Sequence, residues 1–365
     1  MRVLFVSKPI APPWHDGSKN LVRDVAAHLT RARPTVLTVP GAASLGERVT
    51  MDPIYESSGS FAPSVLANAR VLRRLMSGDP HDLWHFVFAP NAASSSAARV
   101  AHATRRALGW KGKLVQTIAS APRSFDGVSR LLFGHTIVAL SEWTRAALIG
   151  AGVQRKQLVV IPPCAAAPHA VTDEERARVR DKLDLGTGPI VLYPGDYEVS
   201  TGADTVARAV ASIAREVPEV RVVFACRPKT KDAAAARDRI IHELDSLHTG
   251  HRTRHVGELD DLAPLLSAAS VVVFPVDDLY GKVDLPLVVL EALALGIPLV
   301  LARGGPLEAI TTARFVDPGD DAALARETIA LLRAGPSAGA SGKELWKTRF
   351  APPVVAAAYD DLYEQ

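Results

Sequence analysis

Short apolar runs alternate with longer mixed stretches along the first 165 residues. Near-continuous apolar runs are typical of parallel strands that are buried on both faces of a sheet. The intervening stretches 17–29 and 91–108 are compatible with crossover helices. The pattern predicts a buried parallel sheet with strands at 2–7, 35–39, 82–88, 113–118, 136–140 and 157–161.

The same alternation returns after residue 188. It predicts strands at 189–195, 220–225, 269–275 and 298–302, with helices at 202–216, 231–247, 287–295 and 320–334. Between the two series, the sequence PPCAAAP at 162–168 carries adjacent prolines, which exclude a helix and a central strand. We therefore expect an α/β fold with two Rossmann-like domains that face each other across a cleft. The expected divisions are 1–165, 170–340 and a helical tail, 341–365, that packs back toward the first domain.

Composition supports two globular domains. The chain has 365 residues, of which 48% are hydrophobic and 22% charged, with a net charge of +3, so disorder is disfavoured. No apolar run reaches the roughly 20 residues that a membrane-spanning helix needs. Lys8 and two prolines interrupt the apolar core that a secretory signal would need. We expect a cytoplasmic protein. Its two cysteines, Cys164 and Cys226, are too few for a disulfide scaffold and wrongly spaced for a zinc site.

The two halves of the chain carry opposite charge. Before His169 there are 20 basic and 9 acidic residues, and from His169 onward 22 and 30, so the halves carry about +11 and −8. A basic first half favours an anionic partner, such as a phosphorylated or lipid-linked acceptor, with peripheral contact at the inner face of a membrane. Two solvated surfaces that differ in charge are the alternative. Nucleic acid is disfavoured because the arginines are scattered among few aromatic residues.

The loop after the first predicted strand is one candidate site. Ligands of open parallel sheets bind beyond the carboxyl ends of the strands. Residues 8–20 form an irregular loop in which Gly17 and Ser18 lead into a helix at Asn20. Backbone amides at the start of a helix can approach an anion. An ordinary turn would use the same residues.

Two loops of the second half carry dense charge. After 189–195 come Asp196 and Glu198, which would repel a phosphate unless a cation lay nearby. After 220–225 come Arg227, Lys229 and Lys231, which either hold a diphosphate or form a solvated turn. Neither the GxGxxG nor the GxxxxGK[ST] pattern occurs, which disfavours NAD chemistry and a Walker-type phosphate loop.

The stretch 273–305 is the most informative. A predicted strand leads into a charged loop, and Pro286 then begins a helix that carries Glu291 among apolar residues. Burying that carboxylate without a partner would be costly, so a hydroxyl-bearing ligand explains it better than chance. A glutamate on the solvent face of the helix is the alternative. Gly304, Gly305 and Pro306, with Glu308 following, form a second cradle or a capped turn.

Several segments together resemble the GT4-type, or group 1, glycosyltransferases of the GT-B fold. The resemblance covers nearly the whole chain. The segments that carry it are the start of the chain up to GSKN at 17–20, the motif DLWHF at 82–86, and residues 139–163, 256–275, 285–305 and 359–363. It implies transfer of a sugar, with retention of anomeric configuration, from a nucleotide-diphosphate donor held by the second domain to an acceptor held by the first. It implies no metal and no other cofactor.

The resemblance also implies roles for particular residues. Glu291 matches a glutamate that contacts the donor ribose, and Gly17 and Ser18 match a loop that approaches the phosphates and the acceptor. The expected donor set adds Gly195, Thr201, Leu285, Pro286, Arg227 and Lys229, and the expected acceptor and phosphate loop adds His15, Asn20 and Arg123.

The motifs for the donor phosphates diverge from the family pattern. The family carries an Arg and a Lys after the first strand of the second domain, where this chain has Asp196 and Thr201. The first of two family glutamates is absent, with Lys282 and Asp284 as its neighbours. A histidine often found after the fourth strand of the first domain is also missing from residues 118–120, Ile-Ala-Ser.

Three hypotheses follow. In a rewired enzyme, Lys282 with Arg227 and Lys229 offsets the diphosphate charge, Asp284 takes over sugar-hydroxyl binding, and Lys8 or Arg123 contributes from the first domain. The alternative is a catalytically degenerate relative that binds a sugar nucleotide or glycan and partners an active transferase. A nucleotide-sugar epimerase is disfavoured because the sequence does not assemble the carboxylate and histidine set it would need.

Overall fold

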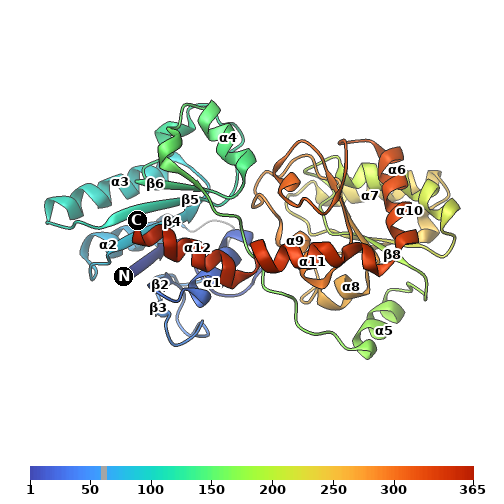
Figure 1. Cartoon of the computed structure of the whole chain (residues 1–365), viewed down its shortest axis with the longest axis horizontal. Coiled ribbons are helices and arrows are strands. Elements are labelled where there is room, and N and C mark those ends of the chain that lie inside the picture. Colours follow the sequence, from blue (N-terminus) through green and yellow to red (C-terminus); the bar gives the residue numbers. More distant parts are fainter. Residues whose placement is uncertain (59–63) are drawn as a thin grey trace. The chain divides into compact units, whose positions relative to one another are not determined.

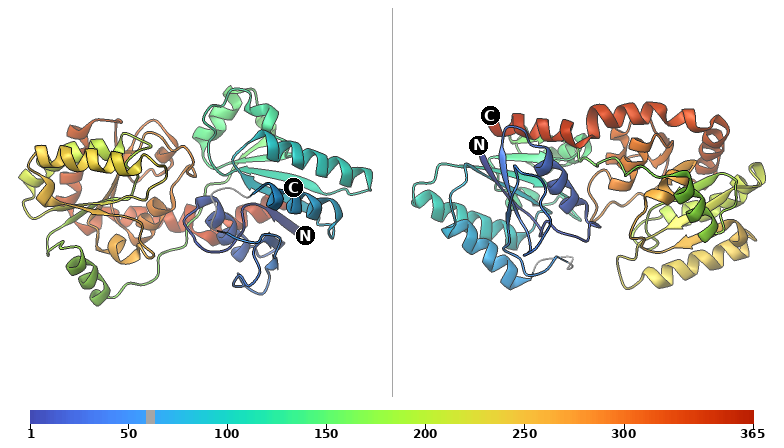
Figure 2. Two further views of the ribbon diagram at one scale, coloured as in Figure 1. Left: turned by 180° about the vertical axis from the view of Figure 1, so that it is seen from behind. Right: turned by 90° about the horizontal axis from the view of Figure 1, so that it is seen from below.

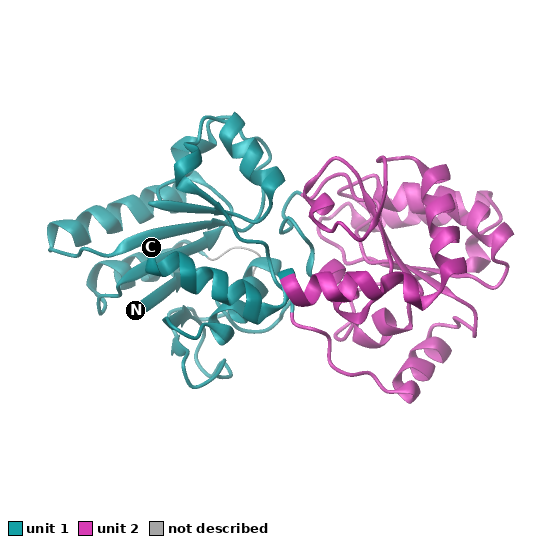
Figure 3. Cartoon of the chain, in the orientation of Figure 1, with its two compact units in different colours: residues 1–165, 280–287, 349–365 teal, residues 166–279, 288–348 magenta. Residues whose placement is uncertain are grey.

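The computed structural model describes residues 1–58 and 64–365. It divides into two compact units, coloured separately in Figure 3. Unit 1 consists of Met1–Ala165, Tyr280–Leu287 and Arg349–Gln365, and unit 2 of Ala166–Leu279 and Val288–Thr348. Each unit contains its own parallel sheet with helices around it (Figure 1). The prediction of an α/β fold with two Rossmann-like sheets is confirmed.

The sheet of unit 1 has seven strands in the order β3-β2-β1-β4-β5-β6-β7, and all pairings are parallel. Six strands fall within one or two residues of the predicted apolar runs. Thr50–Asp52 was not predicted, because a three-residue edge strand with only one apolar side chain, Met51, shows no apolar run. The strands are β1 (Arg2–Val6), β2 (Arg33–Leu37), β3 (Thr50–Asp52), β4 (Leu83–Phe88), β5 (Lys113–Ile118), β6 (Thr136–Ala139) and β7 (Leu158–Val160).

Alternation along β1 assigns its side chains to two cores. Val3 and Phe5 join the cluster formed with α1 (Gly17–His28) and α12 (Pro352–Glu364). Leu4 and Val6 join the cluster formed with α2 (Val65–Ser77) and α3 (Ala92–Ala107). The right view of Figure 2 shows the red terminal helix and the blue α2 on opposite sides of this sheet. A further cluster packs α4 (Glu142–Gly150) near β6 and β7.

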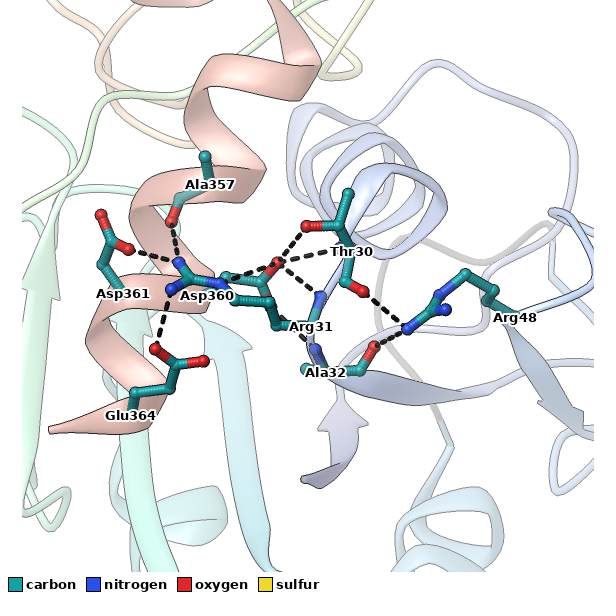
Figure 4. A network of polar contacts seen from close by, with 8 residues as sticks. All are labelled: Thr30, Arg31, Ala32, Arg48, Ala357, Asp360, Asp361 and Glu364. Carbon is teal, nitrogen blue, oxygen red and sulfur yellow. Dashed lines mark hydrogen bonds and ion pairs between the residues drawn. The ribbon is translucent and has the colours of Figure 1, made fainter.

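A buried carboxylate joins the C-terminal helix to the turn before β2 (Figure 4). The Asp360 side chain is 1% exposed. It accepts hydrogen bonds from the backbone N–H groups of Thr30, Arg31 and Ala32, at 2.8, 3.0 and 2.9 Å. The guanidinium of Arg31 also pairs with Asp361 and Glu364 on the surface of α12. α12 is therefore held to unit 1 by polar bonds as well as by apolar packing.

The expected tail, 341–365, is three pieces of helix. α11 (Ala340–Leu345) continues into a π-helical turn, Trp346–Phe350, and α12 then starts at Pro352. Proline is favoured at the first position of a helix, where its missing N–H would be unpaired in any case. The part up to Thr348 belongs to unit 2, and α12 to unit 1, where it packs against α1. Residues 162–168 form neither helix nor strand.

The sheet of unit 2 has six parallel strands in the order β10-β9-β8-β11-β12-β13. β10 and β13 were not predicted, since TRHV and RFV are too polar or too short to show as apolar runs. The strands are β8 (Ile190–Tyr193), β9 (Arg221–Ala225), β10 (Thr253–Val256), β11 (Val271–Phe274), β12 (Leu299–Ala302) and β13 (Arg314–Val316).

The helices of unit 2 follow the predicted ranges closely where predictions were made. α6 packs against α10 and α7, and α5 against α8. Besides α11, these helices are α5 (Asp173–Lys182), α6 (Gly202–Glu216), α7 (Ala233–Ser246), α8 (Ala263–Ala268), α9 (Leu287–Leu295) and α10 (Asp321–Ala334). The 3₁₀ turns in the described part of the chain are Val128–Leu131, Arg155–Gln157, Gly250–Arg252, Pro306–Ala309 and Pro336–Gly339. Within residues 1–58 and 64–365, no helix has the length and hydropathy to cross a bilayer.

Replacing Asp360 by alanine is expected to lower the free energy of unfolding by about 2–4 kcal/mol at pH 7, because three backbone donors lose their acceptor. Burial favours the neutral acid, but hydrogen bonds from residues 30–32 outweigh burial and hold the pKa of Asp360 below its usual value. The stabilisation of the fold by the ionised Asp360 is therefore fully present above about pH 3.9 and is lost as the pH falls through the lowered folded-state pKa.

Urea unfolding of the wild type and the Asp360→Ala variant at pH 7 and in acid measures this contribution. Asp361→Ala is the matched control, since this carboxylate is 68% exposed and exposed ion pairs contribute about 1 kcal/mol or less. Equal losses in the two variants at pH 7 would contradict the assignment.

Candidate functional site

The loops at the carboxyl edge of the unit 2 sheet form a candidate ligand site. The strand order changes direction between β8 and β11, and open α/β sheets bind ligands at such a switch point. The loop after β8 contains residues 194–201, and the loop after β11 begins at Pro275. The backbone N–H of Thr201 donates to Asp277 Oδ1 at 3.0 Å. The two loops that flank the switch point are thus joined directly.

Tyr193, the last residue of β8, shapes the loop that follows it. Its hydroxyl donates to the backbone oxygen of Asp196 at 2.9 Å. A Cβ atom on Gly195 would lie 2.2 Å from the Tyr193 ring, and one on Gly202 would lie 2.8 Å from the hydroxyl. The close approach of this buried ring requires glycine at position 195. The predicted donor residue Gly195 therefore has a clear local packing role.

Asp196, which stands where the family carries an arginine, is fully buried at 0% exposure. Its Oδ2 atom lies 3.2 Å from Nζ of Lys229, which comes from the loop after β9. Its Oδ1 atom accepts the backbone N–H of Val199 at 3.0 Å. The structure brings together two charges that the sequence placed on separate loops, and Lys229 offsets the charge of a carboxylate within the protein.

Two further carboxylates bind the basic loop after β9. Glu198 Oε1 accepts the backbone N–H groups of Lys229 and Thr230 at 2.8 and 3.0 Å. Arg227 Nη1 lies 3.8 Å from Glu258 Oε1, in the loop after β10. Two of the three cations predicted to offset a diphosphate, Arg227 and Lys229, are therefore paired with carboxylates, and a diphosphate would compete with those partners.

The base of this loop cluster is uncharged near neutral pH. Tyr197 and His255 share a hydrogen bond of 2.8 Å between the hydroxyl and Nδ1, and their rings stack with Phe224. Burial lowers the pKa of His255 to about 4. Burial also raises the pKa of the Cys226 thiol far above its usual value. Cys226 is therefore a buried thiol and not a thiolate nucleophile.

Glu291 is the only charged residue of α9 and is half-buried. Its neighbours Leu290 and Ala292 are fully buried. The helix begins at Leu287, so Glu291 lies within its first two turns, as expected. A half-buried carboxylate on a mostly buried helix remains suited to a hydroxyl-bearing ligand, and its contact with a donor ribose stays a prediction.

The segment 280–287 differs from expectation. It lies between β11 and α9 in the sequence, but it belongs to unit 1. Val283 is 4% exposed in the core of unit 1, and its Cγ1 would lie only 3.0 Å from a Cβ on Gly17. A side chain at position 17 would force Val283 to shift by a few tenths of an ångström, so a glycine at the start of α1 suits the close packing of this segment.

Asp284 is 3% exposed and accepts hydrogen bonds from the hydroxyls of Ser141 and Thr144, at 2.5 and 2.6 Å. Ser141 also caps the N-terminus of α4. Both bonds use Oδ2, and burial raises the pKa of the carboxyl even though these bonds lower it. The expected contact of Asp284 with a donor sugar stays a prediction. The observed role of Asp284 is to hold segment 280–287 on unit 1.

The other predicted residues of this segment are placed as follows. Lys282 is half-buried, whereas Leu285 and Pro286 are buried. The guanidinium of Arg123 lies over the ring of Tyr280, 4.6 Å from its centroid. The structure therefore brings Arg123 to segment 280–287 through Tyr280.

The predicted acceptor and phosphate loop of unit 1 is held by its own side chains. Asp16 Oδ1 accepts the backbone N–H of Ser18 at 2.8 Å and caps α1, while Oδ2 pairs with Lys8 Nζ at 2.5 Å. Burial alone would raise the pKa of Asp16, but Lys8 and the hydrogen bonds lower it. The amide of Ser18 is thus used within the loop.

The two other residues predicted for that loop, Asn20 and His15, differ in burial. Asn20 is buried and donates to the backbone oxygen of Trp14 at 2.9 Å. His15 is exposed. Asn20 therefore has a structural role, and the part of His15 in acceptor binding stays a prediction.

Sequence reasoning missed the partners that fix these loops. Asp277 follows β11 by three residues, so its position at a carboxyl strand end was a usable signal. Glu258 follows β10, a strand that the apolar pattern did not reveal. Ser141 and Thr144 lie more than a hundred residues from Asp284 in the sequence, and no local pattern links them. In the described part of the chain, no group of three or more His, Cys, Asp or Glu side chains could hold a metal ion.

Comparison with known proteins gives both a family match and relatives. Residues 188–334 match the family model described as Glycosyl transferases group 1. The GDP-mannose-dependent alpha-(1-6)-phosphatidylinositol monomannoside mannosyltransferase of Mycobacterium tuberculosis is 25% identical over 322 residues, covering 83% of this chain and 81% of that protein. The protein of the same name from Mycolicibacterium smegmatis is 24% identical over 309 residues, covering 80% and 78%.

Solved structures share the fold across the whole chain. HepE from Anabaena in complex with UDP and glucose is 15% identical with a TM-score of 0.74, and all of both chains is covered. A glycosyltransferase from Rickettsia africae is 16% identical with a TM-score of 0.75, covering 100% and 97%. Sucrose-phosphate synthase from Thermosynechococcus elongatus is 19% identical with a TM-score of 0.72, covering 100% and 99%.

We expect Asp284→Asn to leave the free energy of unfolding at pH 7 unchanged or about 1 kcal/mol higher, since an amide oxygen can still accept from both hydroxyls without a buried charge. Asp284→Ala should lower it by about 1–3 kcal/mol, because two hydroxyl donors lose their acceptor. Because the folded-state pKa is raised, the carboxylate reduces stability as the pH rises from about 3.9 through that pKa.

Chemical denaturation of both variants between pH 4 and pH 8 tests this account. The advantage of the Asn variant over wild type should grow with pH. An Asn variant that is as unstable as the Ala variant at pH 7 would show that the charge itself is needed.

Proposed function

We propose that this chain, which is a group 1 glycosyltransferase of the GT-B fold, transfers a sugar from a nucleotide-diphosphate donor to an acceptor hydroxyl. The observation that carries the proposal is the match of residues 188–334 to the group 1 family. That range contains the loops after β8, β9 and β11 and the helix that bears Glu291. Retention of the anomeric configuration and independence from metals and other cofactors are part of the proposal.

In the proposed reaction, the bond between the anomeric carbon and the diphosphate oxygen breaks, and the electron pair leaves with the nucleoside diphosphate. A bond forms from the acceptor oxygen to that carbon, and the acceptor proton is released. The leaving diphosphate gains negative charge, so positive side chains aimed at it lower the barrier. Glu291 would bind hydroxyls of the donor ribose.

The ion pairs determine which cations are available to bind the diphosphate. The pair of Arg227 and Glu258 is long, at 3.8 Å, and both side chains are more than a third exposed, so it contributes little and can be exchanged for a phosphate. Lys229 instead pairs with Asp196, which is fully buried. Removing Lys229 would leave an unpaired buried charge, which is strongly unfavourable. Arg227 is therefore the proposed diphosphate cation of unit 2, Lys229 remains with Asp196, and a contact of Lys282 with the diphosphate stays a prediction.

The charge of the first half supports an anionic acceptor. Residues before His169 carry about +11, which favours a phosphorylated or lipid-linked acceptor and peripheral contact with the inner face of a membrane. The relative from M. tuberculosis is named for GDP-mannose and a phosphatidylinositol mannoside, and HepE was solved with UDP and glucose. Both donor types belong in a first panel of ligands.

A second candidate function is a sugar-nucleotide-binding relative without catalysis that partners an active transferase. The commitment of Lys229 to the buried Asp196 favours it, because that cation is then no longer available to a diphosphate. The same titration and product assay separate the two functions.

Calorimetric titration with GDP-mannose and UDP-glucose tests donor binding. We expect one of them to bind and Glu291→Ala to weaken that binding by at least about tenfold, because two hydroxyls would lose a charged acceptor. Glu174→Ala, on the exposed first turn of α5, is the matched control and should bind as wild type. Undiminished binding to the Glu291 variant would remove this residue from the site.

Turnover of the bound donor tests catalysis. In a product assay with anionic and lipid-linked acceptors, Lys282→Ala and Arg227→Ala should each reduce kcat by about tenfold to a hundredfold, since each removes a charge that offsets the leaving diphosphate. Lys182→Ala, an exposed cation at the end of α5, should have little effect. Donor binding without any product on the acceptor panel would favour the binding protein over the enzyme.

A further inference from the structure

Unit 1 contains a pocket of about 450 Å³ that none of the preceding assignments uses. It lies at the carboxyl ends of β2 and β3, where Pro40 and the segment 53–56 form part of its wall, and the end of α2 forms the rest. Its volume falls within the range of small-molecule sites. Its place at the carboxyl edge of a parallel sheet is where ligands of such sheets bind.

Three arginines of α2 line this pocket. Arg70, Arg73 and Arg74 are spaced three and four residues apart, so they share one face of the helix. Arg74 is oriented by Asp52, whose Oδ2 lies 2.6 Å from its Nε, and each of these side chains is only 18% exposed. Arg70 pairs with Glu56 at 2.5 Å on the surface, where the side chains are 42% and 78% exposed.

Arg73 differs from its two neighbours. It is exposed, and among residues 1–58 and 64–365 its guanidinium has no ion pair or hydrogen bond. The three arginines therefore face two carboxylates, Asp52 and Glu56, and one positive charge at the pocket is uncompensated. The exposed Arg70–Glu56 pair adds little stability, so an incoming anion can take over Arg70 as well.

We propose that this pocket binds a phosphate ester. A guanidinium presents two parallel N–H donors that match two phosphate oxygens, and Arg73 and Arg70 can supply such donors while Arg74 stays fixed beside Asp52. Pro53, Ile54 and Tyr55 provide an apolar wall for the esterified group. That this ester belongs to the sugar acceptor rests on the proposed function, whereas its binding does not.

Two kinds of molecule carry such a phosphate ester: a soluble metabolite-sized ester and the headgroup of a phospholipid. The first turn of α2 exposes Val65 and Leu66, at 85% and 72%. A lipid source would place hydrocarbon surface beside these side chains. A soluble ester would not involve them, so a variant at Leu66 distinguishes the two sources.

The test measures binding in two arms without any nucleotide sugar. One arm titrates glycerol 3-phosphate into the full chain by calorimetry, and the other measures cosedimentation with phosphatidylcholine vesicles with and without phosphatidylinositol. Arg73→Ala should weaken binding at least about fivefold, and Glu56→Gln should strengthen it about twofold to fivefold, because a repelling carboxylate is removed. Arg33→Ala, an exposed arginine at the opposite end of β2, is the control and should bind as wild type.

The outcomes separate the proposal from the transferase assignment. Loss of binding in Arg73→Ala with an unchanged thermal midpoint supports the pocket, whether or not the chain transfers a sugar. A further loss on vesicles alone in Leu66→Gln identifies the lipid headgroup, and equal binding identifies the soluble ester. Wild-type affinity of Arg73→Ala in both arms, or no binding by the wild type in either arm, would overturn the proposal even in an active transferase.

Discussion

The buried carboxylate of Asp196 constrains the charges at the carboxyl edge of the second sheet. It is fully buried and lies 3.2 Å from Nζ of Lys229, and an unpaired charge at that depth would cost several kcal/mol. Lys229 is therefore committed to a partner within the protein. Where the family carries a cation, this chain carries an internal ion pair, and the charge needed by a diphosphate has to come from other loops.

The Asp196–Lys229 ion pair helps to choose between two hypotheses for the divergent motifs, a rearranged phosphate site and an eroded one. Loss of a cation at position 196 alone would indicate decay of the phosphate site. The chain instead pairs the new carboxylate with Lys229 and keeps Arg227 in an ion pair that a phosphate can replace. The segment 280–287 is likewise well packed, with Asp284 bonded to two hydroxyls. Both regions form specific side-chain contacts, which favours a rearranged site over an eroded one.

Much of the fold could be predicted from the apolar pattern, because strands buried on both faces leave continuous apolar runs. β8 and β9 and the helix with Glu291 were located this way within one or two residues. β10 was missed because its sequence TRHV carries polar side chains at a sheet edge, and with it the partner of Arg227. The burial of Asp284 could not be predicted either, because it depends on hydroxyls that are distant in the sequence. The pairing of Lys229 with Asp196 becomes evident only once β8 and β9 are known to be neighbours in the sheet.

A crystal structure with a bound nucleoside diphosphate would test the central claim most directly. The account predicts that Arg227 leaves Glu258 to contact a phosphate oxygen, that Glu291 lies within hydrogen-bond distance of a ribose hydroxyl, and that Lys229 remains on Asp196. A diphosphate contacted by Lys229, with Asp196 left without that partner and Glu291 remote from the nucleotide, would contradict it.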